Sequence, residues 1–170
     1  HLIAGAGNDL IHGSLGNDVY SFDRGDGQDN IDDYDLAVNT NILCFGDGLT
    51  PADILAIRPD KESSDLILRV NDSADLVRLC GYFLPDTEGD DGESYSNKVD
   101  RIEFANGIVW DQAMIQTLVV DNHAPALNIS NTPLQAQAGQ LYTFTIPAEA
   151  ISDPDAWDTI VSWSLSMPDG

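Results

Sequence analysis

A nine-residue unit, repeated along the first 32 residues, restricts the possible folds of this chain more than any other feature of its sequence. Residues 4–12 (AGAGNDLIH) align with residues 13–21 (GSLGNDVYS), and a third copy at 24–32 (RGDGQDNID) follows after two extra residues. In each copy glycines precede an Asp, and a three-residue run with a central apolar residue comes next. A weaker fourth copy is expected to end at Asn41 and Leu43.

The composition of the unit predicts a sharp turn followed by a very short strand. Glycine lets the backbone adopt positive φ in the turn, and alternation in the run points one apolar side chain inward. A strand of three residues cannot bury that side chain alone, so the copies must stack. Stacking places one Asp above another in a chain that already has 29 acidic and 7 basic residues and a net charge of −22. A bound cation would relieve that repulsion.

Calcium suits this arrangement because it is a hard cation that accepts carboxylate and backbone carbonyl oxygens at six to eight positions. Zinc does not, because the chain has no His and Cys residues at ligand spacing. The alternative is a hairpin rich in Gly, Asn and Asp that binds no metal. The remaining acids of this region could be extra ligands, but the expectation for each is a solvated side chain: Asp23, Asp26, Asp32, Asp33 and Asp35.

The repeat resembles the RTX family, the hemolysin-type calcium-binding nonapeptide repeats. That resemblance implies a parallel β-roll in which two nonapeptides form one coil and calcium lies between turns on the same side. The turn at 4–9 should then stack on the turn at 24–29, and the turn of Asp18 on an upstream turn or on the copy near Asn41. The implied calcium ligands are Asp9, Asp18 and Asp29, carbonyls near Gly5, Gly7, Gly16, Gly25 and Gly27, and, as further candidates, Asp26, Asn41, Asp153, Asp155 and Asp158.

Residues 46–120 show short runs with strand character, at 54–58, 65–70, 75–79 and 101–105, which predict antiparallel β-structure. Thr50 and Pro51 predict a helical turn, and Asp111 a capped helix through Leu118. The segment resembles the hemolysin-type calcium-binding-related domain, on CFGDGLTPADI, DLILRV and the ending with Ile102, Phe104, Asn106, Gly107 and Trp110. The family implies a structural end-piece for the roll, with Trp110 in its core.

Residues 121–170 begin with a linker and contain no Lys or Arg after residue 125. Strands are expected at 140–146 and 159–166. The pattern is similar to the first strands of cadherin-like, dystroglycan-type immunoglobulin-fold modules, which implies an adhesive or spacer domain. Asp153, Asp155 and Asp158 would lie on a loop, either as calcium ligands or as a plain Asx turn. A full sandwich needs about 100 residues, so this module would be incomplete.

Together these patterns predict an all-β chain: a short parallel β-roll at 1–45, an antiparallel β cap at 46–120 and a partial β-sandwich module at 121–170. The chain begins inside a predicted strand, at His1-Leu2-Ile3, which indicates a fragment of a longer protein. Cys44 and Cys80 could form a disulfide or remain two separate cysteines.

The charge argues against nucleic acid or anionic lipid as a partner, and no apolar run is long enough to insert into a membrane. No G-x-S-x-G motif is present, and the three histidines share no spacing, so an enzyme is not expected. The RTX resemblance implies a calcium-dependent structural segment of a secreted bacterial protein that uses the type I secretion machinery. Its parent would be an extracellular or cell-surface adhesin with a cell-surface or matrix receptor. The alternative is a toxin or hydrolase in which this segment is a non-catalytic aid to secretion and folding.

Overall fold

The computed structural model describes residues 1–127 and 150–155, and divides the chain into one unit at His1–Asn122 and a second at His123–Gly170. The described residues form short strands and one short helix, so the predicted all-β class is confirmed. No helix among them is long and apolar enough to cross a membrane.

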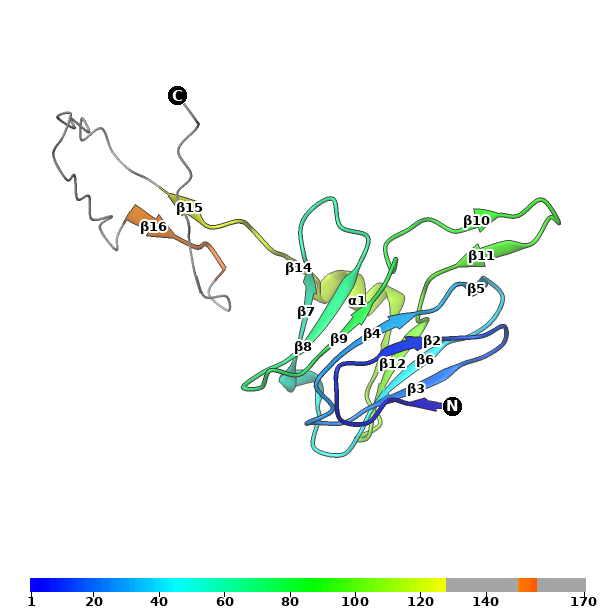
Figure 1. Cartoon of the computed structure of the whole chain (residues 1–170), viewed down its shortest axis with the longest axis horizontal. Coiled ribbons are helices and arrows are strands. Elements are labelled where there is room, and N and C mark those ends of the chain that lie inside the picture. The colour runs from blue at the N-terminus through cyan, green and yellow to red at the C-terminus, as the bar shows by residue number, and fades with distance from the viewer. Residues whose placement is uncertain (128–149, 156–170) are drawn as a thin grey trace, which may run out of the picture. The chain divides into compact units, whose positions relative to one another are not determined.

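The N-terminal repeats form two sheets that the chain visits alternately (Figure 1). β1 (Leu2–Ile3), β3 (Val19–Phe22) and β6 (Ile42–Phe45) pair in parallel in one sheet. β2 (Leu10–His12) and β4 (Gln28–Asp32) pair in parallel in the other. Each nine-residue copy thus contributes one turn and one strand, and two copies complete one coil of a parallel β-roll.

The two extra residues between the second and third copies leave the register of the coils unchanged. Phe22 becomes the last residue of β3, pairs with Phe45 and is 2% exposed, while Asp23 is exposed in the turn. The central residues of β2 and β4, Ile11 and Ile31, therefore still face each other across the sheet. The insertion lengthens a turn and adds an aromatic side chain to the core.

The middle of the chain extends both sheets of the roll. β7 (Ile54–Arg58), β8 (Leu66–Val70) and β9 (Leu76–Leu79) are antiparallel neighbours, as the sequence predicts, but β9 also pairs in parallel with β4. β12 (Arg101–Phe104) pairs in parallel with β6 and antiparallel with β13 (Val109–Asp111). β9 and β12 thus provide one more coil of parallel strands, and β14 (Val120–Asp121) closes the second sheet beside β7.

A separate three-stranded sheet lies at the connection between β4 and β6. β5 (Asp35–Leu36) pairs with β11 (Ser94–Ser96), which pairs with β10 (Thr87–Glu88). The rings of Tyr34 and Tyr95 stack on it with their centroids 5.4 Å apart.

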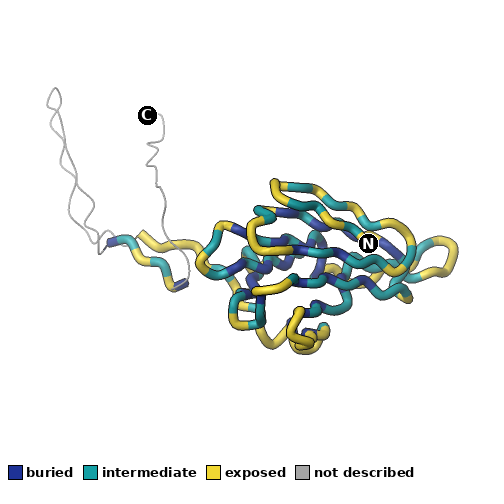
Figure 2. Tube along the Cα trace, turned by 90° about the horizontal axis from the view of Figure 1, so that it is seen from below, coloured by how far each residue is buried: buried dark blue, intermediate teal, exposed yellow. Residues whose placement is uncertain are grey.

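The core lies between the two main sheets, where buried segments run through the first unit and the outer turns are exposed (Figure 2). Tyr20, Leu43 and Ile102 occupy equivalent positions on neighbouring strands of one sheet, and each is 0% exposed. Phe104 stacks on Phe45 and meets Trp110 edge-on, and Trp110 is 5% exposed. The prediction that Trp110 belongs to the core is confirmed.

The two predicted helix starts are also present. Thr50 and Pro51 begin the 3₁₀ turn η1 (Pro51–Asp53), and Asp53 completes a capping box with Thr50. Asp111 caps α1 (Gln112–Leu118) by accepting a hydrogen bond from the Met114 N–H at 2.7 Å. Cys44 and Cys80 are free thiols, so of the two possibilities for these residues the structure has separate cysteines.

In the second unit, β15 (Ala126–Leu127) pairs antiparallel with β16 (Ile151–Ser152). The strands predicted at 140–146 and 159–166, and Asp158, lie outside the described residues.

Candidate metal centre

The turns of the roll form two columns, and the first contains the turns at 4–9 and 24–29. Gly7 and Gly27 form a parallel bridge, with the Gly7 N–H donating to the Asp26 carbonyl at 2.7 Å. The Gln28 N–H donates to the Gly7 carbonyl at 3.2 Å. Gly7 has φ 154° and Gly27 has φ 102°, and a Cβ on Gly27 would lie 1.9 Å from the Gly7 carbonyl oxygen. The turns can approach this closely because both positions are glycine.

Asp9 and Asp29 occupy the same position on neighbouring coils of this column. One oxygen of Asp29, Oδ1, accepts a hydrogen bond from the Asp9 N–H at 2.9 Å. The other, Oδ2, is buried and has no hydrogen-bond partner in the described part of the chain, and Asp29 as a whole is 1% exposed. Burial, and the nearby charge of Asp9, raise the pKa of the Asp29 carboxyl. The structure therefore brings together two of the predicted ligands and leaves one carboxylate oxygen without a partner.

The second column contains Asp18, Asn41 and Asp100. The Asp18 N–H donates to Oδ1 of Asn41 at 2.9 Å, and the Asn41 N–H donates to Oδ2 of Asp100 at 2.7 Å. The predicted pairing of the Asp18 turn with the copy near Asn41 is present. This column is less acidic at its centre, because Asn41 supplies a neutral amide, and the Asp18 carboxylate accepts the Ser14 N–H at 3.0 Å.

The expectation that Asp33 and Asp35 are solvated is wrong, because each is 1% exposed. Asp35 accepts hydrogen bonds from the Gly16 N–H at 2.7 Å and from the Asn39 side chain at 2.7 Å. Asp33 follows β4 directly and points to the space that a Cβ on Gly13 would fill, 2.2 Å from one of its oxygens. Asp33 is buried because the chain places it inside the roll, although a charged side chain would ordinarily face water.

Both Asp33 oxygens and the hydroxyl of Tyr20 lack a well-formed hydrogen bond to any described residue. Burial, with a contribution from the carboxylates of Asp18 and Asp35, raises the pKa of Asp33 to about 6. The same burial raises the pKa of the Tyr20 hydroxyl.

Two residues that bind these turns, Asp75 and Asp100, were not identified from the sequence. Asp75 accepts a hydrogen bond from the Gly25 N–H at 2.8 Å, and the Ser73 hydroxyl holds the pKa of its carboxyl below the usual range. Both residues directly precede strands, β9 and β12, as Asp9 precedes β2 and Asp18 precedes β3. That position is the signal that could have revealed them. The predicted ligand Asp26 is partly buried and accepts the Asp23 N–H within its own turn.

In the second unit, Asp155 is 8% exposed and accepts the His123 N–H at 2.6 Å, with its other oxygen 3.1 Å from Nδ1 of His123. The Asp155 N–H donates to Oδ1 of Asp153 at 2.9 Å, which is an Asx turn. The interaction with His123 holds the pKa of Asp155 below its usual range.

Among residues 1–127 and 150–155, no three His, Cys, Asp or Glu side chains converge as a metal-binding group. The place that best fits a hard cation is the first column, because it combines a partnerless, buried carboxylate oxygen on Asp29 with the carboxylate of Asp9. The glycine turns at 5–7 and 25–27 lie close to this pair in the sequence, and backbone carbonyl oxygens are among the ligands that calcium accepts.

Comparison with known proteins agrees with part of this description. The chain is 38% identical over 102 residues to the iron-regulated protein FrpA of Neisseria meningitidis serogroup C. The match covers 59% of this chain but 8% of that relative, so the chain corresponds to a small part of a much longer protein. Residues 65–114, which contain β8, β9, β12 and β13, match the model of the haemolysin-type calcium binding protein related domain.

Proposed function

We propose that this chain is a calcium-binding structural segment of a large secreted bacterial protein of the RTX type. The observation that carries the proposal is the Asp29 carboxylate, whose second oxygen is buried and has no hydrogen-bond partner among the described residues. Leaving a buried charged group unpaired costs several kcal/mol, so such an oxygen calls for a cation or a proton. The match of residues 65–114 to the haemolysin-type calcium binding related family favours the cation.

The proposed ligands in the first column are the carboxylates of Asp9 and Asp29 with carbonyls of the turns near Gly5, Gly7, Gly25 and Gly27. In the second column the proposed ligands are Asp18, the turn of Gly16 and Asn41. When bound, calcium neutralises the facing carboxylates and links one coil to the next. The protein residues hold the turns in register through the hydrogen bond from Asp9 to Asp29 and the bridge between Gly7 and Gly27.

Calcium binding is coupled to folding because the stacked turns exist only in the folded chain. A ligand at a hundredfold excess over its Kd stabilises the folded state by about 2.7 kcal/mol per site. Extracellular calcium modules bind with Kd on the order of 10⁻⁴–10⁻³ M. At low cytosolic calcium the acidic turns would repel each other and stay open, and in millimolar calcium outside the cell they would fold. This behaviour suits export of an unfolded chain by type I secretion.

The test is a comparison of the chain in EDTA and in millimolar calcium. We expect EDTA to unfold residues 1–45, and calcium to restore the β-signal in circular dichroism and raise the melting temperature. Isothermal calorimetry would give the stoichiometry. A spectrum and melting temperature that respond to neither reagent would refute the proposal.

For the parent protein we favour an adhesin or surface protein, in which this segment joins an RTX roll to cadherin-like modules. The sequence pattern between residues 121 and 158 supports this choice. The second candidate is a toxin or hydrolase in which the segment is non-catalytic. Reading the gene on both sides decides between them, because tandem β-modules of about 100 residues indicate an adhesin. An upstream G-x-S-x-G or H-E-x-x-H domain indicates an enzyme.

A further inference from the structure

Two pairs of stacked turns in the roll are each joined by two side-chain hydrogen bonds that run in opposite directions. In the first column, the Gln28 N–H donates to Oδ1 of Asn8 at 3.0 Å. In return, the Asp9 N–H donates to Oδ1 of Asp29 at 2.9 Å. Asn8 lies opposite Gln28, and Asp9 opposite Asp29, in the register of the two coils. Each turn both accepts and donates one bond, and we call this reciprocal pair of bonds the clamp.

The second column repeats the clamp with different residues. The Thr40 N–H donates to Oδ1 of Asn17 at 2.8 Å. In the opposite direction, the Asp18 N–H donates to Oδ1 of Asn41 at 2.9 Å. Asn17 is the equivalent of Asn8 in the nine-residue unit. The same arrangement therefore forms twice, although the later turns of the two columns differ in sequence.

Burial does not account for Asn8 and Asn17, because both are exposed. The third copy has Gln28 at this position, and its longer side chain donates to the Ala74 carbonyl at 3.1 Å. The Gln28 side chain accepts no backbone N–H from any residue that the structure describes. An acceptor with the length of an Asn side chain is therefore what distinguishes the two clamped turns.

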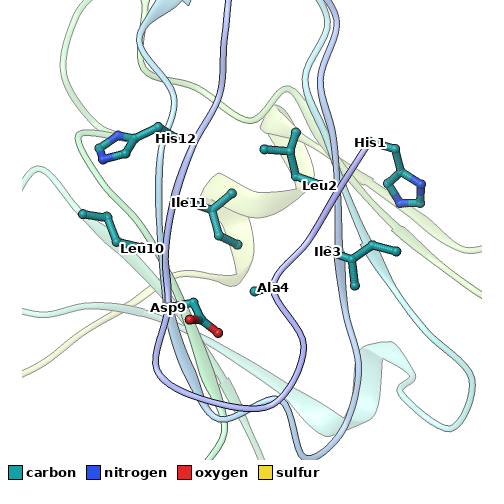
Figure 3. A pocket seen from close by; sticks show the side chains of 8 residues that line it. All are labelled: His1, Leu2, Ile3, Ala4, Asp9, Leu10, Ile11 and His12. Atoms are coloured by element: carbon teal, nitrogen blue, oxygen red, sulfur yellow. The ribbon is translucent and has the colours of Figure 1, made fainter.

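The clamp keeps the Asp9 carboxylate on the inner side of the roll. Figure 3 shows Asp9 on the same side of β2 as Ile11, which packs against the core, with Leu10 on the other side. A slip of one residue in register would turn each side chain of the strand to the opposite side. Asn8 binds the next coil directly before Asp9, so Asp9 stays opposite Asp29, whose Oδ2 is buried without a partner among the described residues.

We propose that Asn8 and Asn17 are positioning residues for calcium binding, each of which holds the Asp that follows it in register with the next coil. This inference rests on the proposed function, in which Asp9 and Asp18 are ligands. The two asparagines act through these neighbours rather than as ligands themselves. Because an amide is neutral, this half of the clamp adds no charge to turns that already carry facing carboxylates.

The first test measures hydrogen exchange of two amides in the full chain, in millimolar calcium. Asn17→Ala should speed exchange of the Thr40 amide by about tenfold, because Oδ1 of Asn17 is its acceptor. Asn8→Ala should speed exchange of the Gln28 amide by less, since the Gly7 carbonyl at 3.2 Å also accepts this N–H. Each replacement should leave the amide of the other column at its parent rate.

Side-chain length separates the clamp from a general need for a polar group. Asn8→Asp keeps an acceptor at the same distance from the backbone, so the Gln28 amide should stay protected. Asn8→Gln keeps the amide group but not the length, so exchange of the Gln28 amide should match that in Asn8→Ala.

The second test is calorimetric titration with calcium. Asn8→Ala should raise the calcium Kd by about fivefold, the effect of losing one hydrogen bond. The matched control is Asn106→Ala, because Oδ1 of Asn106 accepts the Ile108 N–H at 3.1 Å within a single turn. This control loses a bond of the same kind and should keep the parent Kd.

Exchange of Thr40 and Gln28 that is the same in the parent and the Ala variants would overturn the inference. Faster exchange with an unchanged calcium Kd would also overturn it, because the asparagines would then join the coils without positioning ligands. A parent chain that binds calcium with the same Kd as both Ala variants refutes this inference alone. A parent chain that gives no calcium heat refutes the proposed function, and this inference with it.

Discussion

Asp29 places a carboxylate in the interior of the roll, and only one of its two oxygens accepts a hydrogen bond from a described residue. Its Oδ1 binds the Asp9 N–H, and its Oδ2 faces no donor in the described chain. Replacing Asp29 with Ala, or Asp9 with Ala, should weaken calcium binding by about tenfold, which corresponds to about 1.4 kcal/mol. Calorimetric titration of each variant measures the change.

The matched control for these variants is Asp86→Ala. Asp86 carries the same carboxylate, but it forms an ion pair with Lys98 in a loop that is not one of the glycine turns. Its replacement should leave the calcium Kd unchanged. Equal losses in all three variants would mean that calcium binds diffusely to the negative surface rather than between Asp9 and Asp29.

Asp33 should make stability depend on pH in the acidic range. Burial raises the pKa of its carboxyl to about 6 in the folded chain, above its unfolded value of about 3.9. The folded state therefore holds this proton more tightly, and the associated stability is full below pH 4 and lost as the pH rises through 6. Replacing Asp33 with Asn removes that loss. The free energy of unfolding of the variant should therefore exceed that of the parent by about 2–3 kcal/mol at pH 7, and the two values should agree near pH 4.

Urea unfolding at a series of pH values measures this difference, with calcium held constant. Asp32→Asn is a suitable control, because Asp32 is the preceding residue and is only partly buried. A stability gap between parent and Asp33→Asn that is the same at pH 4 and pH 7 would contradict the assignment. Such a result would mean that the Asp33 side chain is not buried in its charged form.

At the scale of the elements, the Asp111 side chain determines where α1 begins. Its carboxylate satisfies the Met114 N–H, one of the donors that a helix N-terminus leaves without a partner. Replacing Asp111 with Ala should lower the free energy of unfolding by about 1 kcal/mol and the melting temperature by a few degrees. Asp111→Asn keeps an oxygen that can accept the Met114 N–H, so the free energy of unfolding should fall much less in this variant. Thermal melts of both variants make the comparison, and equal losses would assign the effect to charge instead.

Individual strands and turns could be predicted from the sequence, because the residues within each one determine its conformation. The alternation of Leu66, Leu68 and Val70 places all three in the core, and each is 0% exposed. The stacking of the turns at 4–9 and 24–29 followed from the repeat, since the insertion between them affects a turn rather than a strand.

What the sequence could not provide is the pairing of distant strands. β9 lies beside β4, and β12 beside β6, although neither segment contains a recognisable glycine turn before its strand. Asp75 and Asp100 acquire their roles only through that pairing, so a search for the repeat passes over them. The burial of Asp33 and Asp35 likewise depends on the path of the chain between β4 and β6.

At the scale of the whole chain, residues 1–122 form a unit with its own core and sheets. A chain that ends at Asn122 should therefore fold alone, with the calcium response and melting temperature of the full chain to within a few degrees. Circular dichroism and calorimetry on both chains measure this. A shortened chain without cooperative melting would show that residues after 122 are needed for the fold of the first unit.

Parallel coils that each add one strand to both sheets have a mechanical consequence. A force applied to the N-terminus and resisted beyond β12 would break the few bonds of the outermost coil before loading the next. Stretching a single molecule should then give a series of small, similar extension steps along the roll, followed by a larger rupture when β7, β8 and β9 separate.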